Sequence, residues 1–221
     1  MDFRERFARR AALELHDGEY VNLGFGIPTA IANFIPPGIE VILQTENGCL
    51  AFGGTPYVGK EDSDVANAGG QPITLVKGSA VFDSTVAFAM IRGGHMDSAF
   101  LGALEVDQEG NIANWALPLA PGRYSPGPGG AVDLVAGTPK VVALLQHANK
   151  SGESKIKRHC TLPITGIGVV KVIITDQAVF YVEKKGLVLK EIIAGETVED
   201  IEKITEASFT VAEDICEYRL S

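Results

Sequence analysis

The chain has 221 residues, of which 46% are hydrophobic and 21% charged, a balance typical of a globular protein with a sizeable core. Lysine and arginine number 19 against 28 aspartates and glutamates, and the resulting net charge of −9 argues against a general nucleic-acid binder, which needs basic surface to neutralise phosphates. No stretch approaches ~18 consecutive apolar residues, which argues against a membrane span, and the mixed charges of Met1–Arg6 predict no signal peptide.

A helix is predicted at the start of the chain. Apolar residues recur every four positions from Phe3 to Leu15 with charged residues between them, the pattern of an amphipathic helix. Asp17-Gly18 is expected to end this helix, and residues 20–23 are predicted to form a short buried strand.

A parallel arrangement is indicated by the next segments. The glycine turn 24–26 leads into a second helix, which Pro28 is expected to begin and Pro36-Pro37-Gly38 to end. Residues 40–44 read as a further strand. Strand, glycine turn, helix and strand in succession are typical of a parallel α/β sheet.

The middle of the chain alternates loops with regular elements. Residues 53–72 are rich in Gly, Pro, Asp and Asn and are predicted to be a long surface or site loop. Ser84 is predicted to cap a helix running through Ile91, which Gly93-Gly94 ends.

A hairpin and a long irregular segment follow. Residues 99–106 are predicted to form a strand, 107–111 a turn, and 112–115 the returning arm of a hairpin. The span 117–130 is so rich in proline and glycine that a functional loop without regular structure is expected there.

The last third of the chain predicts more strands and one helix. Residues 141–145 and 172–175 read as apolar strands, and 179–189 as an antiparallel hairpin. Thr197-x-x-Asp200 resembles a capping box that opens a last helix. Without a repeat or a linker, the simplest prediction is one α/β domain over residues 1–221, with an open, mostly parallel sheet flanked by helices.

One carboxylate lies where open α/β sheets bind ligands. Glu46 comes directly after the predicted strand 40–44 and before Asn47-Gly48, at the carboxyl edge of the sheet. Position alone leaves two interpretations open: a functional carboxylate, or a helix-capping or salt-bridged glutamate.

Three glycine-containing segments could bring backbone close to a ligand. Residues 24–26 lie where a phosphate loop would, but they lack the third glycine of a dinucleotide fingerprint and any G-K-[S/T], which favours a tight turn. Backbone N–H groups of 92–95 and 126–130 could stabilise an oxyanion, and two ordinary turns are the alternative.

The histidines show no metal-ligand spacing. None of His16, His95, His147 and His159 belongs to an H-E-x-x-H or similar motif, so no metal site is predicted. For His95 we expect a structural role in which the ring donates to backbone. No G-x-S-x-G elbow supports a serine hydrolase.

The three cysteines are far apart in the sequence. Cys49, Cys160 and Cys216 form no C-x-x-C pair. This favours reduced structural thiols in a cytoplasmic protein over a disulfide or metal role.

Nine segments together resemble a known family. They are V-N-L-G-F-G-I-P at 21–28, T-E-N-G at 45–48, N-A-G at 67–69, F-A-M-I-R-G-G-H-M-D at 88–97, L-G-A-L-E-V-D at 101–107, G-N-I-A-N-W at 110–115, G-P-G-G-A-V-D-L-V at 127–135, C-T-L-P-I-T-G at 160–166 and I-I-T-D at 173–176. In this order, over roughly residues 4–211, the chain resembles the small, or β, subunit of the 3-oxoacid, or family I, CoA-transferases. The resemblance implies the open α/β sheet of that family.

The resemblance also implies an activity and site residues. Enzymes of this kind move CoA between short-chain acids, such as acetoacetate with succinate, acetate or butyrate, through a glutamyl-CoA thioester. The nucleophilic glutamate falls on Glu46, with Thr45 in place of the usual serine. Asn22, Gly129 and Gly130 fall beside the bound thioester, where the Asn22 amide and the Gly130 N–H are candidate oxyanion donors. CoA is then a substrate, and no metal or redox cofactor is needed.

Two departures from the family pattern bear on substrate binding. Gly70 stands where several relatives carry a lysine that can meet a CoA phosphate. A longer proline-rich loop, 117–128, replaces the usual short segment just before Gly130, so acyl specificity is expected to differ.

The resemblance implies a partner, the family's large or α subunit, in a heterodimer or heterotetramer. A CoA-thioester hydrolase on the same framework and a non-catalytic regulatory subunit are the alternatives. Release of free CoA without an acceptor acid would favour the hydrolase, and a replaceable Glu46 would favour the regulatory subunit.

Overall fold

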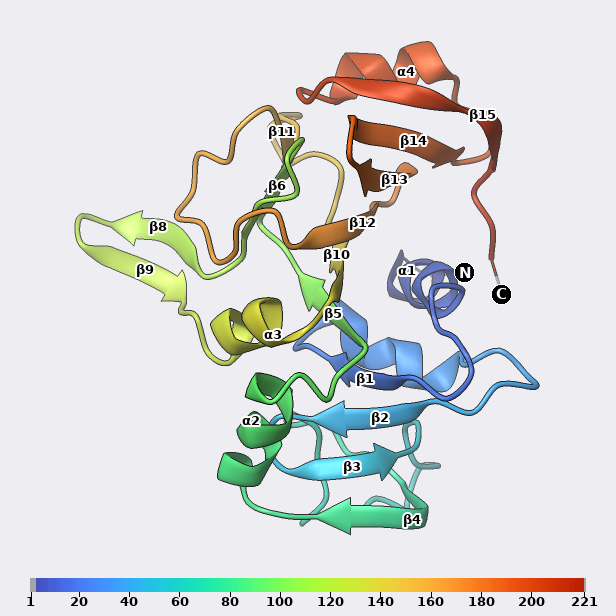
Figure 1. Ribbon diagram of the computed structural model, residues 1–221, viewed down its shortest axis with the longest axis vertical. Helices are drawn as coiled ribbons and strands as arrows, with labels where there is room; N and C mark the ends of the chain where they lie inside the picture. The colour runs from blue at the N-terminus through green and yellow to red at the C-terminus, as the bar shows by residue number, and fades with distance from the viewer. Residues whose placement is uncertain (1–2, 221) are drawn as a thin grey trace.

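One ten-stranded sheet forms the centre of the computed structural model, which describes residues 3–220 (Figure 1). Its strand order is β15-β14-β13-β12-β10-β5-β1-β2-β3-β4. Met1 and Asp2, which belong to the segment inspected for a signal peptide, and Ser221 lie outside the described residues. Within the described part, no helix is long and apolar enough to cross a membrane.

The elements follow one another along the chain with short connections. The strands of the large sheet are β1 (Tyr20–Leu23), β2 (Ile42–Thr45), β3 (Cys49–Phe52), β4 (Leu75–Val81), β5 (Ser98–Gly102), β10 (Lys140–Leu144), β12 (Val170–Ile174), β13 (Ala178–Glu183), β14 (Gly186–Ile192) and β15 (Phe209–Glu217). The helices are α1 (Phe3–Ala12), the 3-10 helix η1 (Ile27–Asn33), α2 (Ser84–Arg92), α3 (Ala131–Gly137) and α4 (Val198–Ile204). The strands of two smaller sheets are β6 (Glu105–Asp107), β7 (Ile112–Ala113), β8 (Ala116–Ala120), β9 (Arg123–Pro126) and β11 (Ile156–Lys157).

The middle of the large sheet is parallel. Strands β2, β1, β5, β10 and β12 all run parallel to their neighbours in that series. Antiparallel pairs join β3 and β4 at one margin and β13 and β14 at the other, and β15 pairs parallel with β14. This confirms the predicted open, mostly parallel α/β sheet.

Helices bury the two faces of this sheet. On one face, Phe7 of α1 and Ile31 of η1 pack with inward residues of β1, β2 and β5 such as Phe100. On the other face, Ile91 of α2 and Leu134 of α3 belong to a second buried cluster. Because side chains alternate along a strand, neighbouring residues of β1 or β5 serve different cores.

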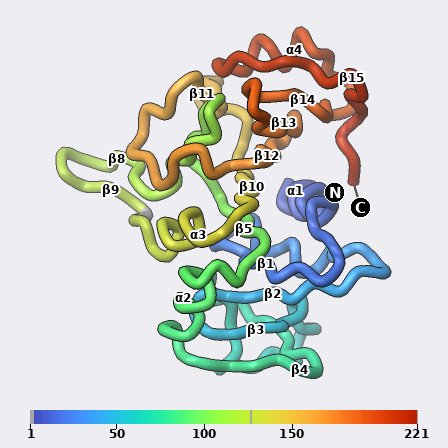
Figure 2. Tube along the Cα trace, viewed as in Figure 1, coloured from blue at the N-terminus to red at the C-terminus, as the bar shows by residue number. Residues whose placement is uncertain are grey.

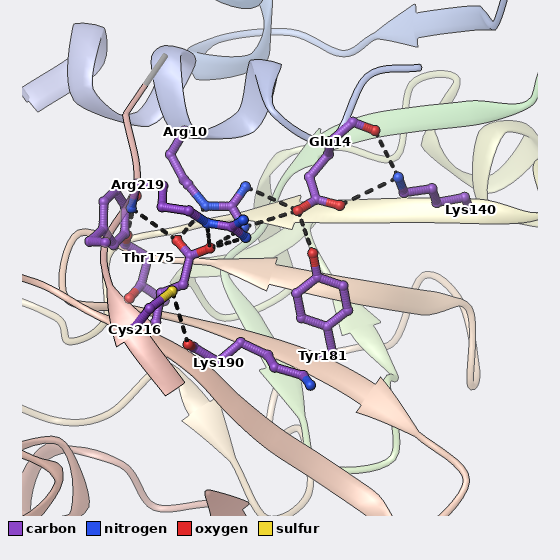
Figure 3. A network of polar contacts seen from close by, with 10 residues as sticks. Arg10, Glu14, Lys140, Thr175, Tyr181, Lys190, Cys216 and Arg219 are labelled. Atoms are coloured by element: carbon purple, nitrogen blue, oxygen red, sulfur yellow. Dashed lines mark hydrogen bonds and ion pairs between the residues drawn. The ribbon is translucent and has the colours of Figure 1, made fainter. Parts of the chain in front are cut away.

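A buried ion network holds α1 against the C-terminal strands (Figure 3). The Arg10 guanidinium is fully buried, and it donates from Nε to Glu191 Oε2 at 2.6 Å and from Nη1 to Glu14 Oε1 at 3.0 Å. Glu14 also accepts from the Tyr181 hydroxyl at 2.6 Å, and Glu191 accepts from Arg219 Nε at 2.7 Å. The two termini therefore lie side by side (Figure 2).

Several local predictions are confirmed. The hairpins β6–β7 and β13–β14 are antiparallel as expected. Thr197 and Asp200 form the predicted capping box of α4. The prediction of free cysteines also holds, since Cys49, Cys160 and Cys216 are all unpaired thiols.

The prediction that 117–130 lacks regular structure is wrong for most of that span. Residues 116–126 form the two-stranded hairpin β8–β9, and only 127–130 remain irregular before α3. Proline is tolerated here because a two-stranded hairpin has free edges and needs few N–H donors. The tip of the hairpin carries Pro121-Gly122, with Gly122 at φ +71°.

Three smaller predictions need correction. The predicted strand 99–106 is broken after Gly102, because β5 belongs to the large sheet and β6 to a small one. Asp83, not Ser84, caps α2: its Oδ1 accepts from the Val86 N–H at 3.0 Å. The helix predicted to begin at Pro28 is a 3-10 helix that begins at Ile27.

Candidate active site

Glu46 lies in the tight turn between β2 and β3, at the carboxyl end of β2. Its neighbours fix this turn. The Thr45 hydroxyl donates to Asn47 Oδ1 at 2.6 Å and accepts from the Ala68 N–H at 2.9 Å. Asn47 Nδ2 donates to the Ala66 carbonyl at 2.8 Å. The T-E-N-G and N-A-G segments are thus hydrogen-bonded to each other, and the threonine hydroxyl makes the contacts that a serine could make.

Gly48 completes the turn and cannot be replaced without distortion. Its φ is +119°, and a Cβ at this position would lie 1.9 Å from the Phe82 carbonyl oxygen. The Phe82 N–H donates to the Gly48 carbonyl at 2.9 Å. Only glycine allows this close backbone approach, which sets the direction of Glu46.

Gly130 lies against the Glu46 carboxylate. A Cβ on Gly130 would lie 2.9 Å from Glu46 Oε2 and 2.8 Å from Cζ of Phe88. Gly130 is the residue before α3, and nothing in residues 3–220 accepts a hydrogen bond from its N–H. An unpaired backbone donor and an unobstructed carboxylate therefore lie next to each other.

The surroundings of Glu46 favour its protonated form. Burial raises the pKa of the Glu46 carboxyl, and the negative charge of Asp133 raises it further. Asp133 itself is held by Arg92, which donates to it at 2.8 and 3.2 Å. Among the described residues, no group donates a hydrogen bond to the Glu46 carboxylate. A half-buried carboxylate without donors is a stronger base and nucleophile than one stabilised by hydrogen bonds.

A cavity of about 640 Å³ extends from Glu46 along the sheet edge. It passes the carboxyl ends of four neighbouring strands, β2, β1, β5 and β10, where Glu46, Gly24, Gly102 and Leu144 lie. This is the place where open α/β sheets bind ligands, and the size is that of a small-molecule site.

The structure brings together only some of the residues predicted from the sequence. Glu46, Gly129 and Gly130 all line the cavity. Asn22 does not line it: the side chain is 1% exposed, and its Nδ2 donates to Gln44 Oε1 at 2.5 Å. Gly70 lies in a turn with φ +72° and is also outside the cavity wall.

The other glycine segments differ in their relation to the cavity. Residues 24–26 line it, as do 127–130, whereas 92–95 do not. The prediction that the His95 ring donates to backbone is wrong, because this ring is exposed and makes no hydrogen bond within residues 3–220. It follows Gly93-Gly94 at the free end of α2 and has no acceptor in reach.

Four further wall residues, polar and apolar, were not predicted: Leu104, Asn114, Gln146 and Lys155. Gln146 follows β10 as Glu46 follows β2, so the strand-end rule could have identified it. Lys155 lies in a polar connection, and no local signal marks it.

Comparison with known proteins decides the family. The model of the family described as Coenzyme A transferase matches residues 4–203. The chain belongs to the coenzyme A transferase family. It is therefore an enzyme of the transferase class, as its resemblance implied.

Relatives within the coenzyme A transferase family match over nearly their whole length. A probable succinyl-CoA:3-ketoacid coenzyme A transferase, in Bacillus subtilis (strain 168), has a subunit that is 48% identical over 212 residues, covering 96% of this chain and 97% of that one. The beta subunit of the acetate CoA-transferase of Escherichia coli (strain K12) is 46% identical over 215 residues, covering 97% of both chains.

A solved structure confirms the coenzyme A transferase fold. The acyl-CoA transferase (YdiF) apoenzyme from Escherichia coli O157:H7 superposes with a TM-score of 0.75 at 25% identity, over 99% of this chain and 43% of that one. The predicted fold class is thus confirmed by both the sheet topology and this likeness.

Proposed function

We propose that this chain is the small, or β, subunit of a CoA-transferase that moves CoA between short-chain carboxylic acids through covalent intermediates on Glu46. The observation that carries the proposal is the Glu46 carboxylate, which has no hydrogen-bond donor within residues 3–220 and faces a cavity beside the N–H of Gly130. The names of the relatives support a 3-oxoacid such as acetoacetate paired with succinate or acetate, and butyrate is a further short-chain acid of the same kind.

The reaction begins with attack of a Glu46 carboxylate oxygen on the carbonyl carbon of an acyl-CoA. The carbon–sulfur bond breaks, CoA leaves as a thiolate, and an acyl-glutamyl anhydride remains. The thiolate then attacks the glutamyl carbonyl, which releases the first acid as its carboxylate and leaves a glutamyl-CoA thioester. Each step exchanges one acyl bond for another, so no redox or metal chemistry is required for balance.

The second acid reverses these steps. Its carboxylate attacks the glutamyl thioester and displaces the CoA thiolate, which gives a new mixed anhydride. The thiolate then attacks the acyl carbonyl of that anhydride, forming the new acyl-CoA and regenerating the Glu46 carboxylate. The enzyme returns to its starting state with CoA on the second acid.

Every tetrahedral intermediate in this sequence carries an oxyanion. The Gly130 N–H is the donor best placed for it, and such a donor contributes on the order of 3 kcal/mol, or ~10²-fold in rate. Asn22 acts indirectly in this proposal, because its amide is committed to Gln44 beneath the site. An α subunit in a hetero-oligomer is proposed to supply the other walls of the cavity, and the assembled enzyme is proposed to work in the cytoplasm.

The test is to trap the intermediate. The co-purified complex of this chain with its α subunit is incubated with acetoacetyl-CoA and digested, and the peptide that contains Glu46 is analysed by mass spectrometry. A CoA adduct on Glu46 that hydroxylamine removes is expected. Recovery of unmodified peptide together with stoichiometric free CoA, in the absence of acceptor acid, would instead identify a hydrolase.

A further inference from the structure

The cavity has a polar end wall opposite Glu46. This wall is the edge of the three-stranded sheet β11-β6-β7. Pairing of β11 with β6 and of β6 with β7 places Lys155, Leu104 and Asn114 side by side at that edge. The Val106 N–H donates to the Lys155 carbonyl at 3.0 Å, and the Leu104 N–H to the Ala113 carbonyl at 2.9 Å. All three edge residues line the cavity.

Lys155 is fixed in the backbone but not in its charge. Its N–H donates to the His147 carbonyl at 2.8 Å, which ties it to the segment that follows Gln146. The side chain is half-buried, and in residues 3–220 its ammonium has neither an ion pair nor a hydrogen bond. Burial lowers the pKa of this ammonium, and the charge of Asp176, which forms no ion pair with it, acts in the opposite direction.

Other charges near the end wall are already occupied. The Glu105 carboxylate accepts from Thr161 and from the Leu162 N–H. Asp176 Oδ1 accepts from the His147 N–H at 2.7 Å. A half-buried cation without a partner is unfavourable unless a ligand supplies an anion. Lys155 therefore lacks a counter-charge that a substrate can provide.

The position of the end wall limits which anion can reach it. Leu104 follows β5, which lies two strands from β2, so the wall is roughly 10 Å from the Glu46 side of the cavity. A short acyl chain and an extended lysine side chain together bridge this distance. The phosphates of CoA lie at the far end of the pantetheine arm, away from the reacting thioester.

We propose that Lys155 determines substrate specificity by binding a second carboxylate at the far end of the acyl chain, which favours dicarboxylic acids such as succinate over acids with an apolar tail. The proposal rests on the proposed transfer reaction at Glu46. Asn114, whose Nδ2 is unpaired within the described residues, is a second donor for the same carboxylate.

The kinetic test compares two acceptor acids in the complex with the α subunit. Lys155→Met should lower kcat/KM for succinate roughly 10- to 100-fold, the loss of a charged hydrogen bond, and leave butyrate within a few-fold. Lys155→Arg keeps the charge and should restore most of the succinate activity. Lys171→Met changes an exposed lysine outside the cavity and serves as the matched control.

Two results would overturn the proposal. Equal losses for succinate and butyrate, with a raised KM for acyl-CoA, would assign Lys155 to CoA binding. Unchanged kinetics with both acids would mean that Lys155 binds neither. Calorimetric titration of the complex with succinate needs no turnover, so it tests Lys155 even if the enzyme proves to hydrolyse its thioester. Loss of succinate binding in Lys155→Met but not in Lys171→Met is expected.

Discussion

The buried charges beneath α1 and the charges that face the cavity differ in the number of their partners. Burial opposes the charge on Arg10, yet the hydrogen bonds and negative charges of Glu191 and Glu14 outweigh it and raise the pKa of the guanidinium. Burial also opposes ionisation of Glu14, yet Arg10, Tyr181 and Lys140 lower its pKa. Glu46 and Lys155, in contrast, have no ion-pair partner in the described chain.

This contrast separates two uses of buried charge. A paired network holds elements together and has no capacity left for a ligand. An unpaired carboxylate or ammonium is held in place by its backbone and remains available for a reacting group. The backbone contacts of Glu46 and Lys155 come from a tight turn and a sheet edge, so neither depends on a charge partner for its position.

Removing the unpaired carboxylate should have the largest effect. Glu46→Gln keeps the size of the side chain but removes the nucleophile, and kcat is expected to fall on the order of 10⁴-fold or more. The thermal midpoint should stay unchanged, because Glu46 contributes no hydrogen bond within the described residues. Steady-state transfer assays and calorimetry check both outcomes. A variant that retains ping-pong turnover would contradict the assignment.

Removing the centre of the paired network should act on stability instead. Arg10→Met leaves Glu14 and Glu191 buried without their cation and is expected to lower the free energy of unfolding by about 3–5 kcal/mol. Denaturant titration of the complex measures this change. Lys203→Met, which breaks an exposed pair with Asp200, is the control and should leave the midpoint in place.

The reverse double replacement sharpens this prediction. Arg10→Met combined with Glu191→Leu removes both charges of one pair, so it should destabilise less than Arg10→Met alone. An equal or greater loss would mean that packing, not an unpaired charge, sets the effect.

A methyl group beside the carboxylate should slow the reaction with little effect on folding. Gly130 has φ −84°, which alanine adopts without strain, but the Gly130→Ala methyl would press on the Glu46 carboxylate and the Phe88 ring. A displaced nucleophile is expected to lower kcat by up to about 10²-fold. Adding Phe88→Leu relieves only the ring contact, so the double variant should remain slow. Full recovery in it would exclude the Glu46 contact as the cause.

The smallest expected effect is on the pH profile. Glu46 attacks as a carboxylate, so kcat/KM falls as the pH drops through its raised pKa. Asp133→Asn removes a negative charge that raises this pKa, and the acid limb should therefore move to lower pH. Asp200→Asn, far from the cavity on α4, should leave the limb in place. A shift toward higher pH in Asp133→Asn would contradict the electrostatic assignment.

Strand-end reasoning and motif order predicted the centre of the site. The apolar strand before Glu46 and the T-E-N-G segment are local signals, and both survive in the fold. Gly130 was predicted from the family pattern, and its contact with Glu46 is visible only once α3 and β2 are brought together. The sheet class followed from the alternation of strands and glycine turns.

What the sequence could not predict depends on pairing between distant segments. Lys155 reaches the cavity because β11 pairs with β6, about fifty positions earlier in the chain. The hairpin β8–β9 was missed because its prolines and glycines outweighed a cross-strand register that no local pattern reveals. Asn22 carries a family motif, yet its contact with Gln44 depends on the register of β1 and β2.

The bond between Arg10 and Glu191 has a consequence for how the chain acquires its structure. The two residues are 181 positions apart, so the guanidinium of the first helix meets its main counter-charge only after β14 has been made. Contacts of such sequence separation slow folding and link it to completion of the chain. During synthesis α1 would remain loosely docked, and the nascent protein should become resistant to proteases in one late step.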